Sequence, residues 1–346
     1  MTLSGRARRE WRIVLWLSLG SAVLSGYFGY AVAAEESGPW HATVSGVLHS
    51  LVIATPIILF EAKGQHLAIV RRMRRLPLGW YFVLRVVFYA VVILTGLILV
   101  GGLRDENFAF DRVFRNSLVF SISMAVITNV VYQIGSLLGF RTLRSLATGR
   151  YAKPQRERRT FLLIDMKNST GIAERLGPIR FHELLNDFFR DIADASLMCG
   201  AEIHKYVGDE AILTWPGDVG LQDGSVLSCP FVVRDNVAAN DRRYRERFGL
   251  QPTFRAALHH GEIVTGEIGD VRREIAYVGD TLNVAARLLE TAKTLGHDVL
   301  ASTDLLARAS LPPGIHTVSL PVQEMRGREA PLGVAALERP LAAETG

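Results

Sequence analysis

Four long apolar stretches in the first 140 residues constrain the fold of this chain more than any other feature. They cover residues 13–34, 44–60, 79–102 and 117–140. Each is about long enough for a helix to cross a hydrocarbon core of ~30 Å. The chain has 49% hydrophobic residues and a mean hydropathy of +0.20, which is too apolar for a protein that lies entirely in water. We therefore predict a transmembrane domain of four helices over residues 1–140.

Lysine and arginine residues predict the orientation of these helices. They gather before the first stretch, between the second and third, and after the fourth. These residues are Arg6, Arg8, Arg9 and Arg12; Lys63, Arg71, Arg72, Arg74 and Arg75; and Arg141, Arg144, Arg150, Lys153, Arg156, Arg158 and Arg159. Because cytoplasmic loops are enriched in basic residues, we expect both termini in the cytoplasm, with the helices in the inner (plasma) membrane. Membrane topology then explains the formal charge of +5, and we predict no nucleic-acid partner.

The first apolar stretch has an alternative interpretation as a cleaved signal peptide. Its length of ~22 residues exceeds the usual apolar region of such peptides. The residues that follow, AVAAEES, also fit a cleavage site only loosely. We therefore favour a retained helix.

Polar residues inside the apolar stretches are candidates for function. The second stretch contains His49, the third contains Arg85, and the fourth contains Asn129 and Gln133. A haem or quinone site would need a second histidine facing His49, and the other stretches contain none. We therefore favour the structural alternative, a hydrogen bond between helices or a histidine at the membrane interface, and we predict a snorkelling side chain for Arg85.

A polar, basic segment follows the fourth stretch, and we predict that residues 141–157 form a cytoplasmic linker. This segment either holds the following domain near anionic lipid or transmits a helix movement to it, and we favour tethering. Residues 158–340 form the second predicted domain, and residues 341–346 form a tail. The two cysteines, Cys199 and Cys229, have no CxxC spacing and are predicted to be reduced thiols.

Short strand-like runs alternate with amphipathic helices after Thr160, which predicts a layered α/β domain. We expect strands at 161–164, 201–207, 210–215, 253–260 and 275–278, with a terminal pair at 317–325 and 333–337. We expect helices at 171–199, 231–248 and 281–293, and a loop at 216–230. The two strands that flank Gly208 and Asp209 are predicted to form a hairpin with a tight turn.

Asp165 and Asp209 each follow an apolar strand where it meets a turn. Side chains at such positions can converge from neighbouring strands, and carboxylate oxygens are ligands that Mg²⁺ prefers. The alternative for Asp165 is a helix cap, and the alternative for Asp209 is a role in the turn alone. Taken singly, each aspartate favours that structural alternative.

Asn283 and Arg287 lie four residues apart in GDTLNVAARLLE (279–290), so they share one face of the predicted helix. An amide and a guanidinium on one face can orient a ribose and neutralise charge on a phosphate. A solvated helix face is the alternative, and the spacing alone does not exclude it.

Several ordered motifs together resemble the catalytic domain of the class III nucleotidyl cyclases. These motifs are FLLIDMKNST (161–170), HKYVGDEAI (204–212), FRAALHHGEIVTGEIGD (254–270), AYVGDTLNVAARL (276–288) and EMRGREAPLGVAAL (324–337). The resemblance covers residues 158–338, which is more than half of the chain. It implies an α/β (ferredoxin-like) catalytic domain behind the four-helix transmembrane domain.

The resemblance also implies residue roles. Asp165 and Asp209, with the backbone carbonyl of Met166, are expected to bind two Mg²⁺ or Mn²⁺ ions per active site. The ribose 3′-hydroxyl of ATP would then attack the α-phosphate and release pyrophosphate. Lys205 is expected to contact adenine, Asn283 to orient the ribose and Arg287 to stabilise the transition state. Either Arg326 or Arg328 is expected to meet the terminal phosphates.

Ala276 departs from the family pattern, because adenylate cyclases usually have Asp or Thr at this second base-reading position. Alanine cannot accept a hydrogen bond from the exocyclic amine of adenine. The contact is then lost, supplied by backbone or water, or moved to Glu274 or Tyr277. Losing it would cost about 0.5–1.5 kcal/mol of discrimination.

The single catalytic domain contains both halves of the family's shared active site, so we expect a symmetric homodimer with two equivalent sites. Our leading hypothesis is a membrane-anchored adenylate cyclase that makes cyclic AMP for signalling. The alternatives are a guanylate cyclase and a non-catalytic nucleotide-binding module with the same fold.

Overall fold

The computed structural model describes residues 5–63, 77–104, 112–138, 140–271, 273–323 and 331–340. Its contacts divide the chain into two compact units, Met1–Arg144 and Ser145–Gly346. Their boundary falls within the segment predicted as a linker. Part of that segment is helical, because α6 spans Phe140–Thr148.

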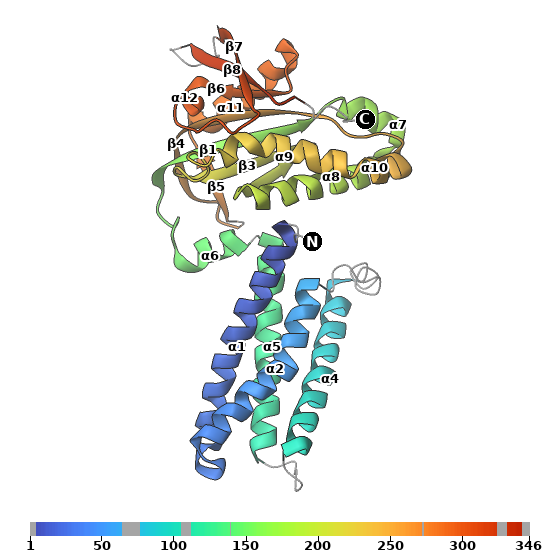
Figure 1. Ribbon diagram of the computed structural model, residues 1–346, viewed down its shortest axis with the longest axis vertical. Helices are drawn as coiled ribbons and strands as arrows, with labels where there is room; N and C mark the ends of the chain where they lie inside the picture. The colour runs from blue at the N-terminus through green and yellow to red at the C-terminus, as the bar shows by residue number, and fades with distance from the viewer. Residues whose placement is uncertain are drawn as a thin grey trace. The chain divides into compact units, whose positions relative to one another are not determined.

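Among the described residues, the N-terminal unit contains four long helices (Figure 1): α1 (Gly5–Ser37), α2 (Pro39–Lys63), α4 (Leu78–Arg104) and α5 (Arg112–Leu138). Three of them carry apolar segments long enough to cross a membrane, at Val14–Ala31, Pro39–Glu61 and Gly79–Val100. The described residues therefore confirm helices at the first three predicted spans that are long and apolar enough to cross a membrane. The apolar part of α5 is shorter, at Phe114–Ile127, so the fourth span stays a prediction.

Arg85 does not snorkel, so that prediction is wrong. Only 5% of its surface is exposed, and its guanidinium forms an ion pair with Glu61 of α2. The hydroxyl of Tyr89 donates a hydrogen bond to the same carboxylate. The sequence analysis missed this contact because Glu61 directly follows the apolar stretch 44–60. A charged residue at the end of a predicted span is ordinary and does not indicate a buried ion pair.

The uncharged polar residues of the helices have different surroundings. His49 Nδ1 bonds the backbone carbonyl of Ser45 on its own helix at 2.8 Å. Asn129 is buried in α5, and neither polar atom of its side chain has a hydrogen-bond partner among the described residues. The side chain of Gln133 lies outside the described part of the chain.

The C-terminal unit is built on a mixed sheet in the order β2-β3-β1-β4-β6-β8-β7, with β5 paired to β4. The strands are β1 (Gln155–Met166), β2 (Glu202–Val207), β3 (Glu210–Pro216), β4 (Phe254–Ile268), β5 (Glu274–Val278), β6 (Val299–Ser302), β7 (His316–Gln323) and β8 (Leu332–Glu338). β1 is antiparallel to both β3 and β4. With helices after β1 and after β3, this is the βαββαβ arrangement of a ferredoxin-like domain.

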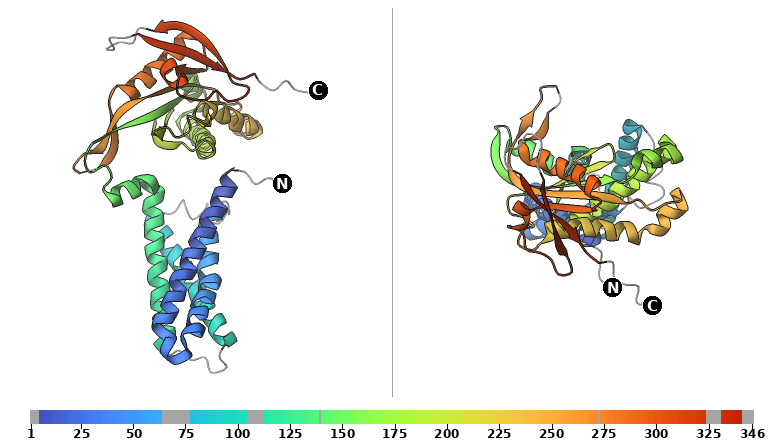
Figure 2. Two further views of the ribbon diagram at one scale, coloured as in Figure 1. Left: turned by 60° about the vertical axis from the view of Figure 1, so that its left-hand side comes forward. Right: turned by 90° about the horizontal axis from the view of Figure 1, so that it is seen from above.

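Helices cover both faces of the sheet, as Figure 2 shows. One face holds α7 (Ser169–Leu176), α8 (Pro178–Met198), α9 (Ser225–Ala239) and α10 (Asp241–Phe248); the other holds α11 (Asp280–Leu295). Because side chains alternate along a strand, Leu162 and Ile164 pack under α8 and α9, whereas Phe161 and Leu163 pack under α11. Asp165 continues the alternation on the α11 face.

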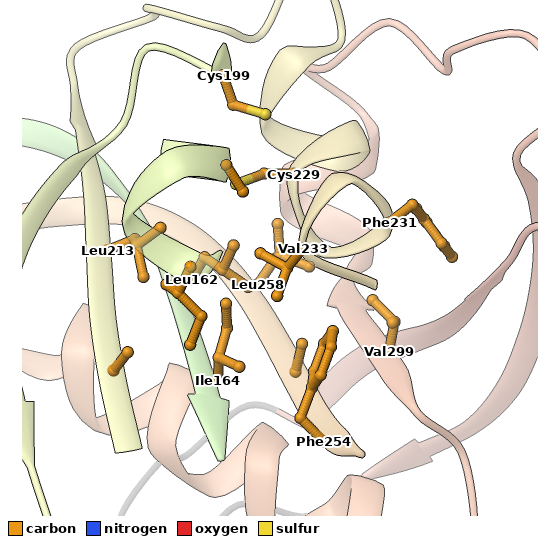
Figure 3. Packing of buried hydrophobic residues seen from close by; sticks show 14 of the residues in the cluster. Leu162, Ile164, Cys199, Leu213, Cys229, Phe231, Val233, Phe254, Leu258 and Val299 are labelled. Atoms are coloured by element: carbon orange, nitrogen blue, oxygen red, sulfur yellow. The ribbon is translucent and has the colours of Figure 1, made fainter. Parts of the chain in front are cut away.

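The larger core lies under α8 and α9, and Figure 3 shows its packing around Leu162, Leu258 and Phe254. Cys199 and Cys229 lie within it as free thiols, as predicted. A hydrogen bond with Cys199, together with burial, raises the pKa of Cys229 well above its usual value. Neither thiol is therefore expected to be reactive.

Two predicted helices are each divided into two. Gly177, at φ 76°, separates α7 from α8, and Pro178 begins α8. Asn240 separates α9 from α10. The predicted loop 216–230 is shorter than expected because α9 begins at Ser225. The sequence analysis also missed β6 and the short α12 (Thr303–Leu306).

Candidate active site

The predicted hairpin is confirmed, and it positions Asp209. Gly208 and Asp209 form the two-residue turn between β2 and β3. Gly208 takes φ 62°, the positive value that the first residue of a type I′ or II′ turn requires. The turn follows the end of β2 and leaves Asp209 only partly buried, next to the end of β1.

Asp165 lies opposite Glu210 on β3 and opposite Arg255 on β4. Directly opposed residues of antiparallel strands share a face, so all three side chains project toward the α11 side. Burial and the nearby charge of Asp209 raise the pKa of Asp165 to about 6, and a hydrogen bond to Asp209 adds to the shift. The predicted convergence of the two carboxyl groups is therefore present.

Glu210 is a third acid at this end of the sheet that sequence reasoning did not single out. Burial, followed by the charges of Asp165 and Asp209, raises its pKa to about 7. The signal was available, because Glu210 follows Asp209 directly and begins β3. The described residues nevertheless contain no group of three or more acidic, His or Cys side chains arranged to hold a metal ion.

The carboxyl pair fits a divalent cation. Burial raises the pKa of Asp165 most, and repulsion from the neighbouring Asp209 raises it further; a cation between the two acids would relieve this repulsion. Mg²⁺ is commonly held by one or two carboxylates plus substrate phosphates, so a pair of aspartates is a sufficient protein contribution. Met166 is buried at 1% exposure, and the role of its backbone carbonyl as a ligand stays a prediction.

Lys205 lies on β2 at a β-bulge, with its side chain exposed. Its Nζ lies 3.6 Å from Oε2 of Glu274 on β5. The ring of His204 meets the ring of Tyr277 edge to face, with centroids 4.5 Å apart. These contacts bring β5 alongside β2, although β5 forms its hydrogen bonds with β4. The structure therefore brings Lys205 into the same region as Ala276 on β5.

Tyr277 is held on the buried side of β5. Its ring meets that of Phe161 at 5.3 Å, and the guanidinium of Arg159 lies 4.8 Å from its centroid. Burial, together with Lys205 and Arg159, lowers the pKa of the adjacent His204 to about 4, so this imidazole is neutral at pH 7.

Asn283 and Arg287 both lie on α11, as predicted. The hydroxyl of Thr281 donates to the carbonyl of Glu262, which fixes the start of this helix against β4. Asn283 is exposed. Arg287 is half-buried, and its Nη1 is buried without a hydrogen-bond partner among the described residues. A buried charged donor without a partner is costly, which favours a ligand at this position.

The charge of Lys293, near the end of α11, lowers the pKa of Asp165. Asn283 precedes Lys293 by ten residues, which corresponds to ~15 Å along the helix axis. Arg326 and Arg328 lie outside the described residues.

Comparisons with known proteins identify the relatives of this chain. Adenylate cyclase 2 of Rhizobium meliloti is 36% identical over 302 residues, which cover 84% of this chain and 82% of that protein. The match is longer than the C-terminal unit, so it extends into the apolar unit. The class III adenylate/guanylate cyclase family includes this chain.

Two further similarities agree with this assignment. Adenylate cyclase of Anabaena cylindrica is 27% identical over 159 residues, 45% of this chain and 31% of that protein. A solved structure of a bacterial light-regulated adenylyl cyclase has a TM-score of 0.52 at 16% identity and covers 62% of each chain, which supports the fold. No family model matches the chain. Membership confirms the resemblance that the ordered motifs predicted.

Proposed function

We propose that this protein is a membrane-anchored adenylate cyclase that converts ATP into 3′,5′-cyclic AMP and pyrophosphate. The contact between Asp165 and Asp209, in a chain of this family, is the observation that carries the proposal. In this proposal, two divalent cations, Mg²⁺ or Mn²⁺, are held by these carboxylates and the carbonyl of Met166. When bound, they supply positive charge that activates the ribose hydroxyl and stabilises the triphosphate.

The remaining site residues bind and orient ATP. Lys205 is exposed at a β-bulge and donates to the adenine ring. Asn283 donates to the ribose and fixes its 3′-hydroxyl toward the α-phosphate. The unpartnered Nη1 of Arg287 donates to the α-phosphate oxygen on which charge develops. Contact between the terminal phosphates and either Arg326 or Arg328 stays a prediction from the motif.

A homodimer completes the site. Lys293, whose charge lowers the pKa of Asp165, lies ten residues after Asn283 on α11, or ~15 Å along the helix axis, and this offset favours a site in which the two halves come from different copies. A second copy, related by twofold symmetry, supplies the missing half and creates two equivalent sites. Apolar side chains exposed beside Lys205 and on β5 support this pairing, since Tyr206, Val207 and Val278 are 42%, 51% and 60% exposed.

The N-terminal helices anchor the enzyme in the inner (plasma) membrane. The apolar segments of α1, α2 and α4 support this part of the proposal. The basic residues around them support a catalytic unit on the cytoplasmic side, where ATP is available. Anchoring also raises the local concentration of catalytic units and favours their pairing.

The test uses the full chain in lipid nanodiscs with Mn²⁺ and either ATP or GTP. We expect cyclic AMP from ATP, a lower rate with GTP, and no product from Asp165→Asn. Loss of product in Asp165→Asn without loss of folding, measured by circular dichroism, separates catalysis from stability. A dimeric preparation that makes no cyclic AMP contradicts the proposal, and a preparation that prefers GTP replaces it with a guanylate cyclase.

A further inference from the structure

Position 276, in the region of β5 and β2 that is proposed to bind the base, lacks a polar side chain. This inference rests on the proposed function, in which Lys205 contacts adenine. The neighbouring position on β5 is Ala276, whose methyl group cannot hydrogen-bond to a base. A site with one donor and no matching acceptor would discriminate poorly between purines.

The strand pattern selects the residue that can replace it. Side chains alternate along β5, so Glu274 lies on the same face as Ala276, and Tyr277 lies on the opposite face. Tyr277 is engaged there by Phe161 and by the guanidinium of Arg159. Its ring therefore has no route to a base that lies beside Ala276.

Glu274 is placed to act with Lys205. Their charged atoms, Oε2 and Nζ, lie 3.6 Å apart, and the two side chains are 45% and 51% exposed. An exposed ion pair of this kind is weak, so it opens readily when a ligand offers better partners. Glu274 lies on β5 and Lys205 lies on β2, and these two strands are not hydrogen-bonded to each other. The ion pair therefore does not arise from strand pairing.

We infer that Glu274 is the specificity-determining residue that takes the place of the missing acid at position 276. Its carboxylate accepts a hydrogen bond from the 6-amino group of adenine, while the ammonium of Lys205 donates to the adjacent N1. The carboxylate and the ammonium thus present one acceptor and one donor, complementary to the donor and acceptor on this edge of the base. No bond is formed or broken by either residue.

The experiment measures discrimination, which a merely structural role would not change. Full-length wild type, Glu274→Ala and Glu274→Gln are assayed in nanodiscs with ATP, with GTP and with purine riboside triphosphate, which lacks the 6-amino group. We expect the wild type to use ATP about tenfold better than the analogue by kcat/KM. In Glu274→Ala, kcat/KM for ATP falls about tenfold and that for the analogue is unchanged.

Two further variants sharpen the result. Glu246→Ala removes a more exposed glutamate that pairs with Arg242 on α10, and it should leave the ATP preference unchanged. The double variant Glu274→Ala with Ala276→Asp moves the acid from position 274 to position 276 on the same face of β5. It should recover the preference for ATP. Recovery would show that an acceptor on this face of β5 is what the site requires.

The opposite results are equally clear. An equal fall with ATP and the analogue means that Glu274 only supports the local structure, and a selective fall with GTP means that it reads guanine; either overturns the inference. If the wild type makes no cyclic product, the proposed function fails. The relative affinities of the same variants for ATP and the analogue, measured by calorimetry, then still decide whether Glu274 reads the 6-amino group.

Discussion

The carboxyl group of Asp165, when protonated, donates a hydrogen bond to Asp209 across the ends of β1 and the β2–β3 turn. The pKa of Asp165 is about 6 in the folded protein, compared with 3.8 for an unperturbed group. The folded state therefore binds more protons than the unfolded state between these values. Stability from this site is present at low pH and is lost as the pH rises from about 4 to about 6.

We predict that Asp209→Asn stabilises the metal-free protein at pH 8, because it removes the charge that opposes ionisation of Asp165. The expected rise in Tm is about 2–4 °C, and it should shrink as the pH falls toward 5. Mn²⁺ should raise the Tm of the wild type and not that of the variant. Differential scanning fluorimetry measures both effects. Asp270→Asn, which removes an exposed carboxylate from the end of the β4–β5 connection, is the control and should show neither effect.

We predict that two inactive variants restore activity when mixed. Asp165→Ala removes a carboxylate, and Arg287→Ala removes the guanidinium that the other copy supplies. In a heterodimer, one of the two sites retains both residues, so a random mixture should reach about a quarter of wild-type activity. Coexpression followed by a cyclic AMP assay measures the recovery.

The control mixture contains Asp165→Ala and Asp209→Ala. Both changes remove a carboxylate from the metal-binding half of the site. In a heterodimer, each of the two sites then lacks one carboxylate, so no activity should return. If heterodimers of Asp165→Ala and Arg287→Ala form and remain inactive, the shared-site arrangement does not hold for this chain.

Arg159 links the core to the base-binding region. It is 3% exposed, its Nε donates to Glu157 at 2.7 Å, and its guanidinium lies over Tyr277. Burial alone would raise the pKa of Glu157, but hydrogen bonds from Thr265 and Arg159 lower it below its usual value. The stability that this carboxylate gains is present at neutral pH and is lost as the pH falls through its lowered pKa.

We predict that Arg159→Met lowers the free energy of unfolding by about 3–5 kcal/mol, because it leaves the carboxylate of Glu157 without its charged partner. The loss should be smaller in an Arg159→Met/Glu157→Gln double variant, and it should diminish as the pH falls toward 4. Chemical denaturation measures these values. The exposed Arg158→Met, whose ion pair with Glu262 is 3.6 Å long, is the matched control and should change stability little.

The sequence predicted those features that depend on local pattern. The β2–β3 hairpin followed from Gly208 and Asp209 between two apolar runs, and the position of α11 followed from its apolar spacing. The division between α7 and α8 was missed because the apolar period continues through Gly177 and Pro178. β6 was missed because four residues are too few to show a period.

Contacts between distant segments needed the structure. The sequence left Glu274 and Tyr277 as equal substitutes for an acid at position 276. Only the position of β5 beside β2 shows that Glu274 meets Lys205 and that Tyr277 turns into the core. The buried pair of Glu61 and Arg85 was hidden for the same reason, because nothing in either helix indicates which residue of the other it meets.

The Glu61–Arg85 pair should hold α2 against α4. Arg85 is 5% exposed, and Tyr89 donates to the same carboxylate, so removal of either charged partner leaves the other buried. We predict that Arg85→Met and Glu61→Leu each destabilise the helical unit by about 3–5 kcal/mol. The double variant should recover much of this loss, since two apolar side chains pack without an unpaired charge. Thermal unfolding in nanodiscs measures the coupling, and Arg112→Met, at the exposed start of α5, is the control. Additive losses in the double variant would show that the two side chains act independently.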